Sequence, residues 1–314
     1  MEGVMMRGAK SMAVAVRAPN GTVVVHSEPL NQAIYGSWLV KVPFLRGITM
    51  LWDTLVLGMR TLMYSAEVAV QGESAAGGAG EAPESPESAF SASIAWGAII
   101  LSLALAVGLF FLLPALLARL ADRYIASALV SNLVEGLIRL FFVVAYIWGV
   151  GYLPDIRRVF AYHGAEHKTV HAFEDGAPLT VDTVRTYTKA HKRCGTSFIL
   201  VTVIISVLVF SLVGRPSLLV RLASRLVLIP LIVGVSYEWL KYGARHGNRW
   251  WVKVLVSPGL AMQKLTTREP DDSMIEVAIA ALKRVLVEDG YLTAQEGLAA
   301  GSLPDGVSPL GEQS

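Results

Sequence analysis

Long apolar runs dominate the pattern of this chain and predict a polytopic membrane protein. A helix needs about 20 apolar residues to cross a bilayer. The first run has 25 residues and the third has 18, both without a charged side chain, while the second and fourth each contain charged residues. The expected spans are 94–118, about 133–153, 196–213 and about 222–240.

Charged residues inside the expected spans need partners, because an unpaired charge in a bilayer is costly. Glu135 and Arg139 are four residues apart and can pair on one helix face. Arg225 and Glu238 lie near opposite ends of the fourth span, where long side chains can reach the interface. Glu135, Arg139 and Arg225 also suggest an ion transporter, but four spans without a pair of corresponding broken helices rank that function last.

The residues before the first span predict two smaller elements. Alternating apolar residues on both sides of Asn20-Gly21 predict a β-hairpin over 12–28. Between 43 and 70 the apolar residues recur with helical spacing but are interrupted by charges, which favours an amphipathic helix at the membrane surface. The Gly-, Ser-, Pro- and Glu-rich stretch at 71–92 reads as a disordered linker.

After the last span, Trp250 and Trp251 suggest an interfacial anchor. Asp271 is expected to cap an amphipathic helix over 274–287. The predicted fold is therefore an all-α polytopic membrane protein with a small N-terminal cytoplasmic β-hairpin and amphipathic interfacial helices. The expected segments are the hairpin segment 1–42, the interfacial helix 43–70, the linker 71–92, spans 1 and 2 in 93–153, a polar motif in 154–195, spans 3 and 4 in 196–240, a C-terminal segment 241–300 and a flexible tail 301–314.

Composition supports the membrane assignment and adds an orientation. The chain is 54% hydrophobic and only 17% charged, against about 25% charged in soluble domains. A net charge of +2 gives no argument for nucleic acid as a partner. Four spans place both termini and the 154–195 loop on the same side of the membrane. Most of the Lys and Arg residues also lie on that side. The positive-inside rule makes that side cytoplasmic, so we expect a multi-pass protein of the bacterial inner membrane.

Candidate chemistry is concentrated in the 154–195 loop. His163, Glu166, His167, His171 and Glu174 all fall on one side of a helix at 100° per residue. His163 and His167, four residues apart, form a bidentate clamp for a divalent metal. Their H-x-x-E-H order is also the order found in inverzincin metallopeptidases, although the match covers only five positions.

A metal that does chemistry usually has three protein ligands and an open position. The expected topology brings His191, Cys194 and Glu238 to the membrane surface beside the His163–His167 clamp. Cys194, Glu238 and the histidine pair also have simpler interpretations. Cys194 can be a small buried hydrophobe, Glu238 can pair with Lys241 or Arg245, and a His pair on a helix is more often surface or core packing than a ligand pair.

Several blocks of this sequence together resemble the YqhQ-like family of bacterial membrane proteins. That family is a domain of unknown function described as a predicted metal-dependent enzyme. The blocks are 1–8, 162–168, 191–198, 237–238, 265–270 and 276–280. The resemblance implies that the family's recurring polar set comprises His163, Glu166, His167, His191, Cys194 and Glu238, and it implies His171 and Glu174 less directly.

Two functions fit these patterns. The first is a metal-dependent hydrolase at the cytoplasmic membrane surface, in which a divalent ion, Zn²⁺ first among them, activates a water and Glu166 is the general base. The expected metal ligands are His163, His167, His191, Cys194 and Glu238. The alternative is a non-catalytic scaffold or assembly factor that binds a membrane or cytoplasmic protein partner and holds a structural metal or polar cluster.

Overall fold

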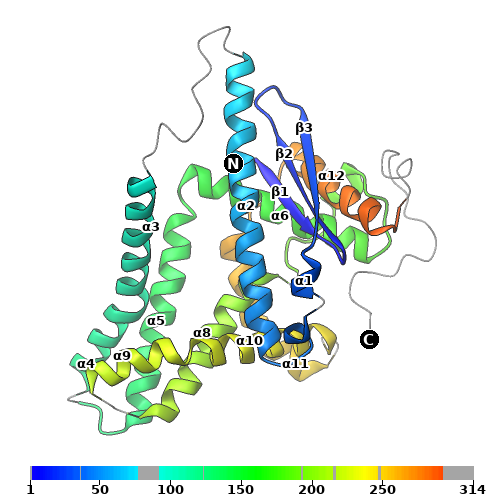
Figure 1. The fold of residues 1–314 in the computed structure, drawn as a ribbon. Helices are drawn as coiled ribbons and strands as arrows, with labels where there is room; N and C mark the ends of the chain where they lie inside the picture. Colours follow the sequence, from blue (N-terminus) through cyan, green and yellow to red (C-terminus); the bar gives the residue numbers. More distant parts are fainter. Residues whose placement is uncertain are drawn as a thin grey trace.

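The structure is a computed structural model, and it describes residues 2–35, 37–76, 92–122, 124–191, 194–214, 217–246 and 249–292. The expected amphipathic helix is present as α2 (Leu45–Ala76), and it continues into the first residues of the expected linker. The rest of that linker, 77–91, and the expected tail at 301–314 lie outside the described residues. Figure 1 shows the sheet, α6 (Pro154–Glu174) and α12 (Asp272–Asp289) toward one end of the molecule, with α4 (Leu113–Ala121) and α9 (Leu218–Val227) at the other.

The N-terminal β-structure is a sheet of three strands, where the sequence predicted a two-stranded hairpin. The expected pair is present as β2 (Ser11–Arg17) and β3 (Val23–Pro29), and β1 (Gly3–Arg7) adds an antiparallel strand to the free edge of β2. The turn between β1 and β2 is held from a distance, because Asp289 at the end of α12 accepts hydrogen bonds from Ala9 N, Lys10 N and Ser11 Oγ. No local sequence pattern around this turn predicts Asp289 as its partner.

The sheet is covered on both faces, which explains the uninterrupted burial of β2 from Ser11 to Val16. Side chains alternate between the faces of a strand. Ala13 and Ala15 join the core formed with α6 and α12. Val14 and Val16 pack instead with Val68 of α2 on the opposite face. The small sheet thus joins α2 to the α6–α12 layer.

Three helices are long and apolar enough to cross a membrane, and a bent helix pair would make four. The three cover Ile100–Ala121, Ala128–Val150 and Gly195–Val213. The first combines the end of α3 (Ala92–Val107), a π-helical turn (Gly108–Leu112) and α4; the others are α5 (Ala128–Val150) and α8 (Gly195–Val213). Their bounds differ from the expected ones by several residues at some ends, as hydropathy alone locates spans only coarsely.

The expected fourth span is broken into two helices. Leu219–Arg225 and Ile229–Gly243 meet at a bend of 40°. Pro230 lies in the first turn of α10 (Ile229–Arg245). A proline is tolerated there because the first N–H groups of a helix have no partner within the helix, whereas a proline in the middle of one long helix would break or kink it. The sequence predicted one short span over about 222–240, whereas the structure starts a new helix next to Pro230.

A buried ionic cluster ties α5 to α9, and Glu135 is its centre. The Glu135 carboxylate is 3.0 Å from Nη2 of both Arg139 and Arg225 and 3.7 Å from Nε of Arg221. The side chains of Glu135 and Arg225 are 2% and 3% exposed. The expected Glu135–Arg139 pair is therefore present, and two further arginines from α9 share the same carboxylate.

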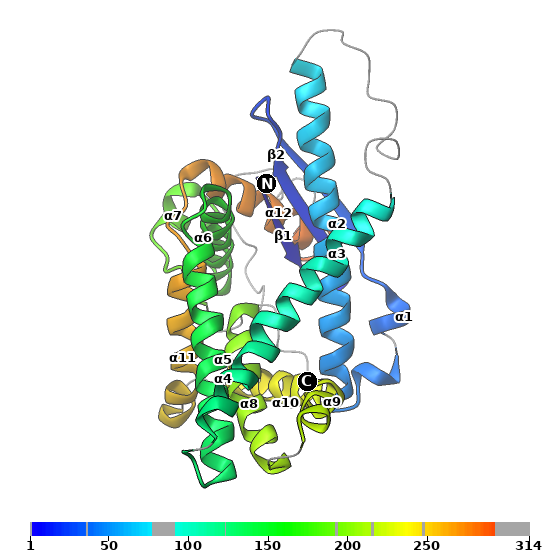
Figure 2. The same ribbon diagram turned by 90° about the vertical axis from the view of Figure 1, so that its left-hand side faces the viewer.

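The C-terminal half supplies two helices that border the polar motif. The helix expected at 274–287 is present as α12, and Asp271 caps it by accepting a hydrogen bond from Met274 N at 2.9 Å. The segment in which the sequence predicted a tryptophan anchor forms α11 (Trp250–Thr266). It packs mainly against α8 and leads up to α6 (Figure 2), so its end arrives at the polar motif.

Candidate metal centre

The centre is built on α6, a helix of 21 residues that carries the whole H-x-x-E-H motif. One turn separates His163 from His167, and their ring centroids are 4.3 Å apart. His167 is buried, with 3% of its surface exposed, and His163 is half-buried. The two imidazoles of the predicted clamp therefore lie close together on the inward side of the helix.

Cys194 joins this clamp from the start of α8. Its Sγ lies 3.2 Å from Nε2 of His163. Cys194 is the N-cap of α8, and both Thr196 N and Thr196 Oγ1 lie within hydrogen-bond reach of the sulfur, at 3.4 and 3.1 Å. Donors at a helix N-terminus stabilise negative charge, which suits a thiolate ligand. His163, His167 and Cys194 each offer a ligand atom within 4.8 Å of the other two.

Backbone carbonyls orient both imidazoles of the clamp. His163 Nδ1 is 2.9 Å from the carbonyl oxygen of Thr266, and His167 Nδ1 is 2.6 Å from that of Lys189. A carbonyl can only accept, so each Nδ1 carries the proton and each Nε2 keeps a lone pair. Metal-binding histidines commonly hold their second nitrogen in this way. The donor set therefore fits a divalent ion.

A second group of possible ligands lies beside the first. His171, Glu174 and His191 also bring ligand atoms within 4.8 Å of one another. His191 Nε2 is 3.1 Å from Glu174 Oε2, and His171 Nε2 donates to the carbonyl oxygen of Ala190 at 2.7 Å. The ring centroids of His167 and His191 are 5.7 Å apart. The polar face of α6 thus offers two adjoining ligand groups, where the sequence led us to expect one.

Gln263 of α11 positions the segment that supplies His191 and Cys194. It is 1% exposed, accepts a hydrogen bond from His191 N at 2.9 Å and donates to His191 O at 2.8 Å. The same amide also donates to Ser197 Oγ at 3.0 Å. The sequence did not predict this role of Gln263, because a single glutamine in an apolar helix carries no pattern that identifies its hydrogen-bond partners.

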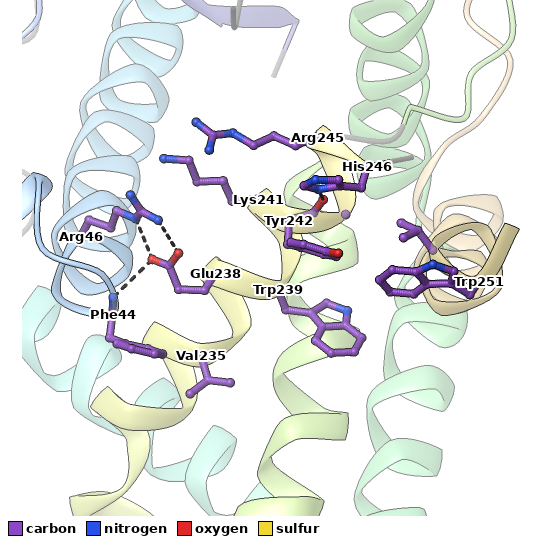
Figure 3. A pocket seen from close by; sticks show the side chains of 12 residues that line it. Phe44, Arg46, Val235, Glu238, Trp239, Lys241, Tyr242, Arg245, His246 and Trp251 are labelled. Carbon is purple, nitrogen blue, oxygen red and sulfur yellow. Dashed lines mark hydrogen bonds and ion pairs between the residues drawn. The ribbon is translucent and has the colours of Figure 1, made fainter. Parts of the chain in front are cut away.

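Two predicted residues stand apart from the ligand groups. Glu238 belongs to neither group. Its carboxylate forms a two-pronged ion pair with Arg46 of α2 and accepts a hydrogen bond from Phe44 N at 3.2 Å (Figure 3). The hydrogen bonds from Arg46 to the Glu238 carboxylate raise the pKa of the Arg46 guanidinium above its usual value. We expected Glu238 to reach the motif, or else Lys241 or Arg245, but the docking of α2 against α10 supplied a better-matched partner.

Glu166 is the second of these residues. It is half-buried on α6, between the two clamp histidines in sequence, and it makes no hydrogen bond or ion pair with any other described residue. Its neighbour Lys168 is different, because its buried ammonium group hydrogen-bonds to Glu269 and lowers the pKa of that carboxyl group. Glu166 is thus left as a carboxylate beside the clamp without an evident structural role among the described residues.

A close backbone approach brings the Thr266 carbonyl to His163. Gly164 faces the backbone of Arg268, whose carbonyl oxygen occupies the space a Cβ atom would need. Arg268 N also donates to Phe160 O at 2.8 Å. The stretch after α11 therefore lies directly against α6 only because position 164 has no side chain.

Replacing Gly164 with alanine should separate these two segments. We expect a loss of about 1–3 kcal/mol in the free energy of unfolding, typical of forcing atoms into a packed site, together with weaker metal binding. Thermal unfolding and a metal titration would measure both effects. Gly58→Ala is the matched control, since a Cβ atom there meets nothing within 4 Å and alanine favours a helix by about 0.5–1 kcal/mol. Equal behaviour of the two variants would contradict the packing argument.

Comparison with known proteins places this chain beside relatives whose descriptions record no activity. A family model described as "Protein of unknown function (DUF1385)" matches residues 42–288, which include both ligand groups. The "Uncharacterized protein YqhQ" of Bacillus subtilis (strain 168) is 33% identical over 297 residues, covering 91% of this chain and 90% of the relative. No solved structure matches. The resemblance inferred from the sequence blocks is confirmed.

Proposed function

Because the chain belongs to the DUF1385 family, whose description leaves the activity open, we propose a function from the site itself: a metal-dependent membrane hydrolase. The observation that carries the proposal is the meeting of His163, His167 and Cys194 with both imidazoles held in the tautomer that leaves Nε2 available. Two nitrogens and one thiolate suit Zn²⁺. Three protein ligands also leave a fourth position for a water.

The chain's own residues have separate roles in this proposal. A divalent ion held by His163, His167 and Cys194 would supply Lewis acidity, which lowers the pKa of a water to about 7. Glu166 would be the general base, which fits a carboxylate next to the clamp with no partner among the described residues. The carbonyls of Thr266 and Lys189 keep the imidazoles oriented. The reaction class is hydrolysis of a peptide, ester or headgroup bond at the membrane surface.

The Lys and Arg distribution supports a site on the cytoplasmic side of a bacterial inner membrane, as the sequence predicted. In that orientation the sheet, α6 and α12 form a cytoplasmic layer over the candidate spans. A substrate that contains or sits next to lipid would reach the centre from the bilayer surface.

Replacing Glu166 with glutamine tests the assignment of the general base. We expect the variant to keep its metal and to lose about 10²- to 10⁴-fold in turnover, the usual contribution of a positioned base. Fluorogenic peptide, ester and phosphodiester probes would measure turnover, and elemental analysis would measure the metal. Asp155→Asn, an exposed carboxylate on the same helix, is the control. Full activity of Glu166→Gln would refute the role of Glu166.

A structural metal in a scaffold protein is the second candidate, and one observation favours it. His167 and Cys194 are only 3% and 7% exposed, and the ring of His191 is a further imidazole nearby, with its centroid 5.7 Å from that of His167. Structural sites use four protein ligands, whereas catalytic sites keep one position open. X-ray absorption spectroscopy of the metal-loaded protein would separate the two, because a water ligand indicates catalysis and a third imidazole indicates a closed structural site.

A further inference from the structure

A cavity of about 530 Å³ opens near the C-terminal end of α10, away from both ligand groups. Its walls come from α10, the start of α2 and the start of α11 (Figure 3). None of the residues that line it belongs to the candidate metal centre. The cavity therefore calls for an explanation of its own.

The charges around this cavity do not cancel. Arg46 and Glu238 neutralise each other in their ion pair. Lys241 and Arg245 follow Glu238 at helical spacings of three and seven residues, so all three lie on one face of α10. Neither Lys241 nor Arg245 makes an ion pair with any residue in the described parts of the chain. Figure 3 shows both side chains extending to the same side as Arg46.

The opposite side of the cavity is apolar and aromatic. Trp239 and Trp251 border it, and the ring of Tyr242 stacks on His246 at a centroid distance of 4.3 Å. Val235 extends this surface back along α10 toward the middle of the candidate span. Trp and Tyr gather at the headgroup level of membranes. The cavity thus combines two cations that have no ion-pair partner among the described residues with an aromatic and aliphatic wall.

We propose that this cavity binds an anionic phospholipid of the surrounding bilayer. Lys241 and Arg245 hold the phosphate, and an acyl chain lies along Trp239 and Val235. Charge complementarity favours this occupant, since basic residues at the end of a membrane helix attract anionic lipids. A soluble anion would make no contact with the apolar wall, whereas an acyl chain would. This lipid site is independent of the proposed metal chemistry.

Native mass spectrometry of the full chain in detergent tests the proposal. Phosphatidylglycerol and phosphatidylcholine of equal chain length would be titrated separately. We expect phosphatidylglycerol to bind roughly 30-fold more tightly, as two interfacial cations predict. The Lys241→Gln/Arg245→Gln variant should lose that preference, and the charge-preserving swap Lys241→Arg/Arg245→Lys should keep it.

Arg60→Gln/Arg157→Gln, which removes two exposed cations outside the cavity, is the matched control and should retain the preference. Equal binding of the two lipids by the unaltered protein would overturn the proposal. It would also be overturned if the control variant lost as much preference as the cavity variant, or if excess inorganic phosphate displaced the bound phosphatidylglycerol. Circular dichroism and a melting curve would confirm that each variant is folded.

Discussion

Replacing His163 with alanine, or Cys194 with serine, should leave the purified protein without its divalent ion. Each substitution removes one of three proposed ligands whose donor atoms lie within 4.8 Å of one another. Loss of a residue that merely orients a ligand costs about 10- to 100-fold in metal affinity, so the loss of a ligand itself should cost at least about 100-fold. Elemental analysis after dialysis against a weak chelator would measure the effect.

The two substitutions test different parts of the site. His163→Ala removes a nitrogen from α6, while Cys194→Ser changes only one atom at the cap of α8, and a serine hydroxyl can still accept the hydrogen bond from Thr196 N. The second variant should therefore fold normally and still lose the metal. His26→Ala, an exposed histidine on β3 that belongs to neither ligand group, is the control. Unchanged metal content in both site variants, or a metal-free unaltered protein, would rule out the centre.

The largest effect on stability should come from Glu135→Gln. The Glu135 carboxylate is 2% exposed and sits against Arg139, Arg221 and Arg225, whose side chains are at most 5% exposed. Removing its charge would leave these guanidinium groups buried with too little negative charge. Breaking a buried ion pair from one side costs about 3–5 kcal/mol. We expect a strongly lowered melting temperature in detergent, and tryptophan fluorescence during heating would measure it.

Glu288→Gln is the control for this substitution. Glu288 pairs with Arg284 one helical turn away, and both side chains are more than a third exposed, so its loss should change stability by less than about 1 kcal/mol. If Glu135→Gln melted like Glu288→Gln, the cluster would contribute little to the attachment of α9 to α5. Such a result would favour water reaching the arginines and replacing the lost carboxylate.

Much of the local structure follows from patterns within single elements. Helical spacing placed His163 and His167 on one face of α6, and their rings do lie 4.3 Å apart. Asn20-Gly21 predicted the β2–β3 turn, and Asp271 predicted the start of α12. These features depend on interactions within a few residues of one another, so a short stretch of sequence contains the information they need.

The pairing of distant residues was predicted less well. Cys194 meets His163 as expected, but His191 lies in the adjoining group and Glu238 pairs with Arg46. The strand β1 was missed because its partner is β2 and its turn is held by Asp289. Each outcome rests on helices or strands that approach each other only in the folded chain.

For this protein, the sequence by itself determined the candidate membrane helices, the family and the histidine face of α6, because hydropathy and helical period are local properties. Only the tertiary structure decided which donors meet that face and which groups orient it. The orienting groups at Thr266 and Lys189 are backbone carbonyls, which every residue has. No residue type marks them, and they reach the imidazoles because Gly164 lets the segment after α11 pack against α6 and because α7 (Val181–Arg185) leads the chain back along the same helix.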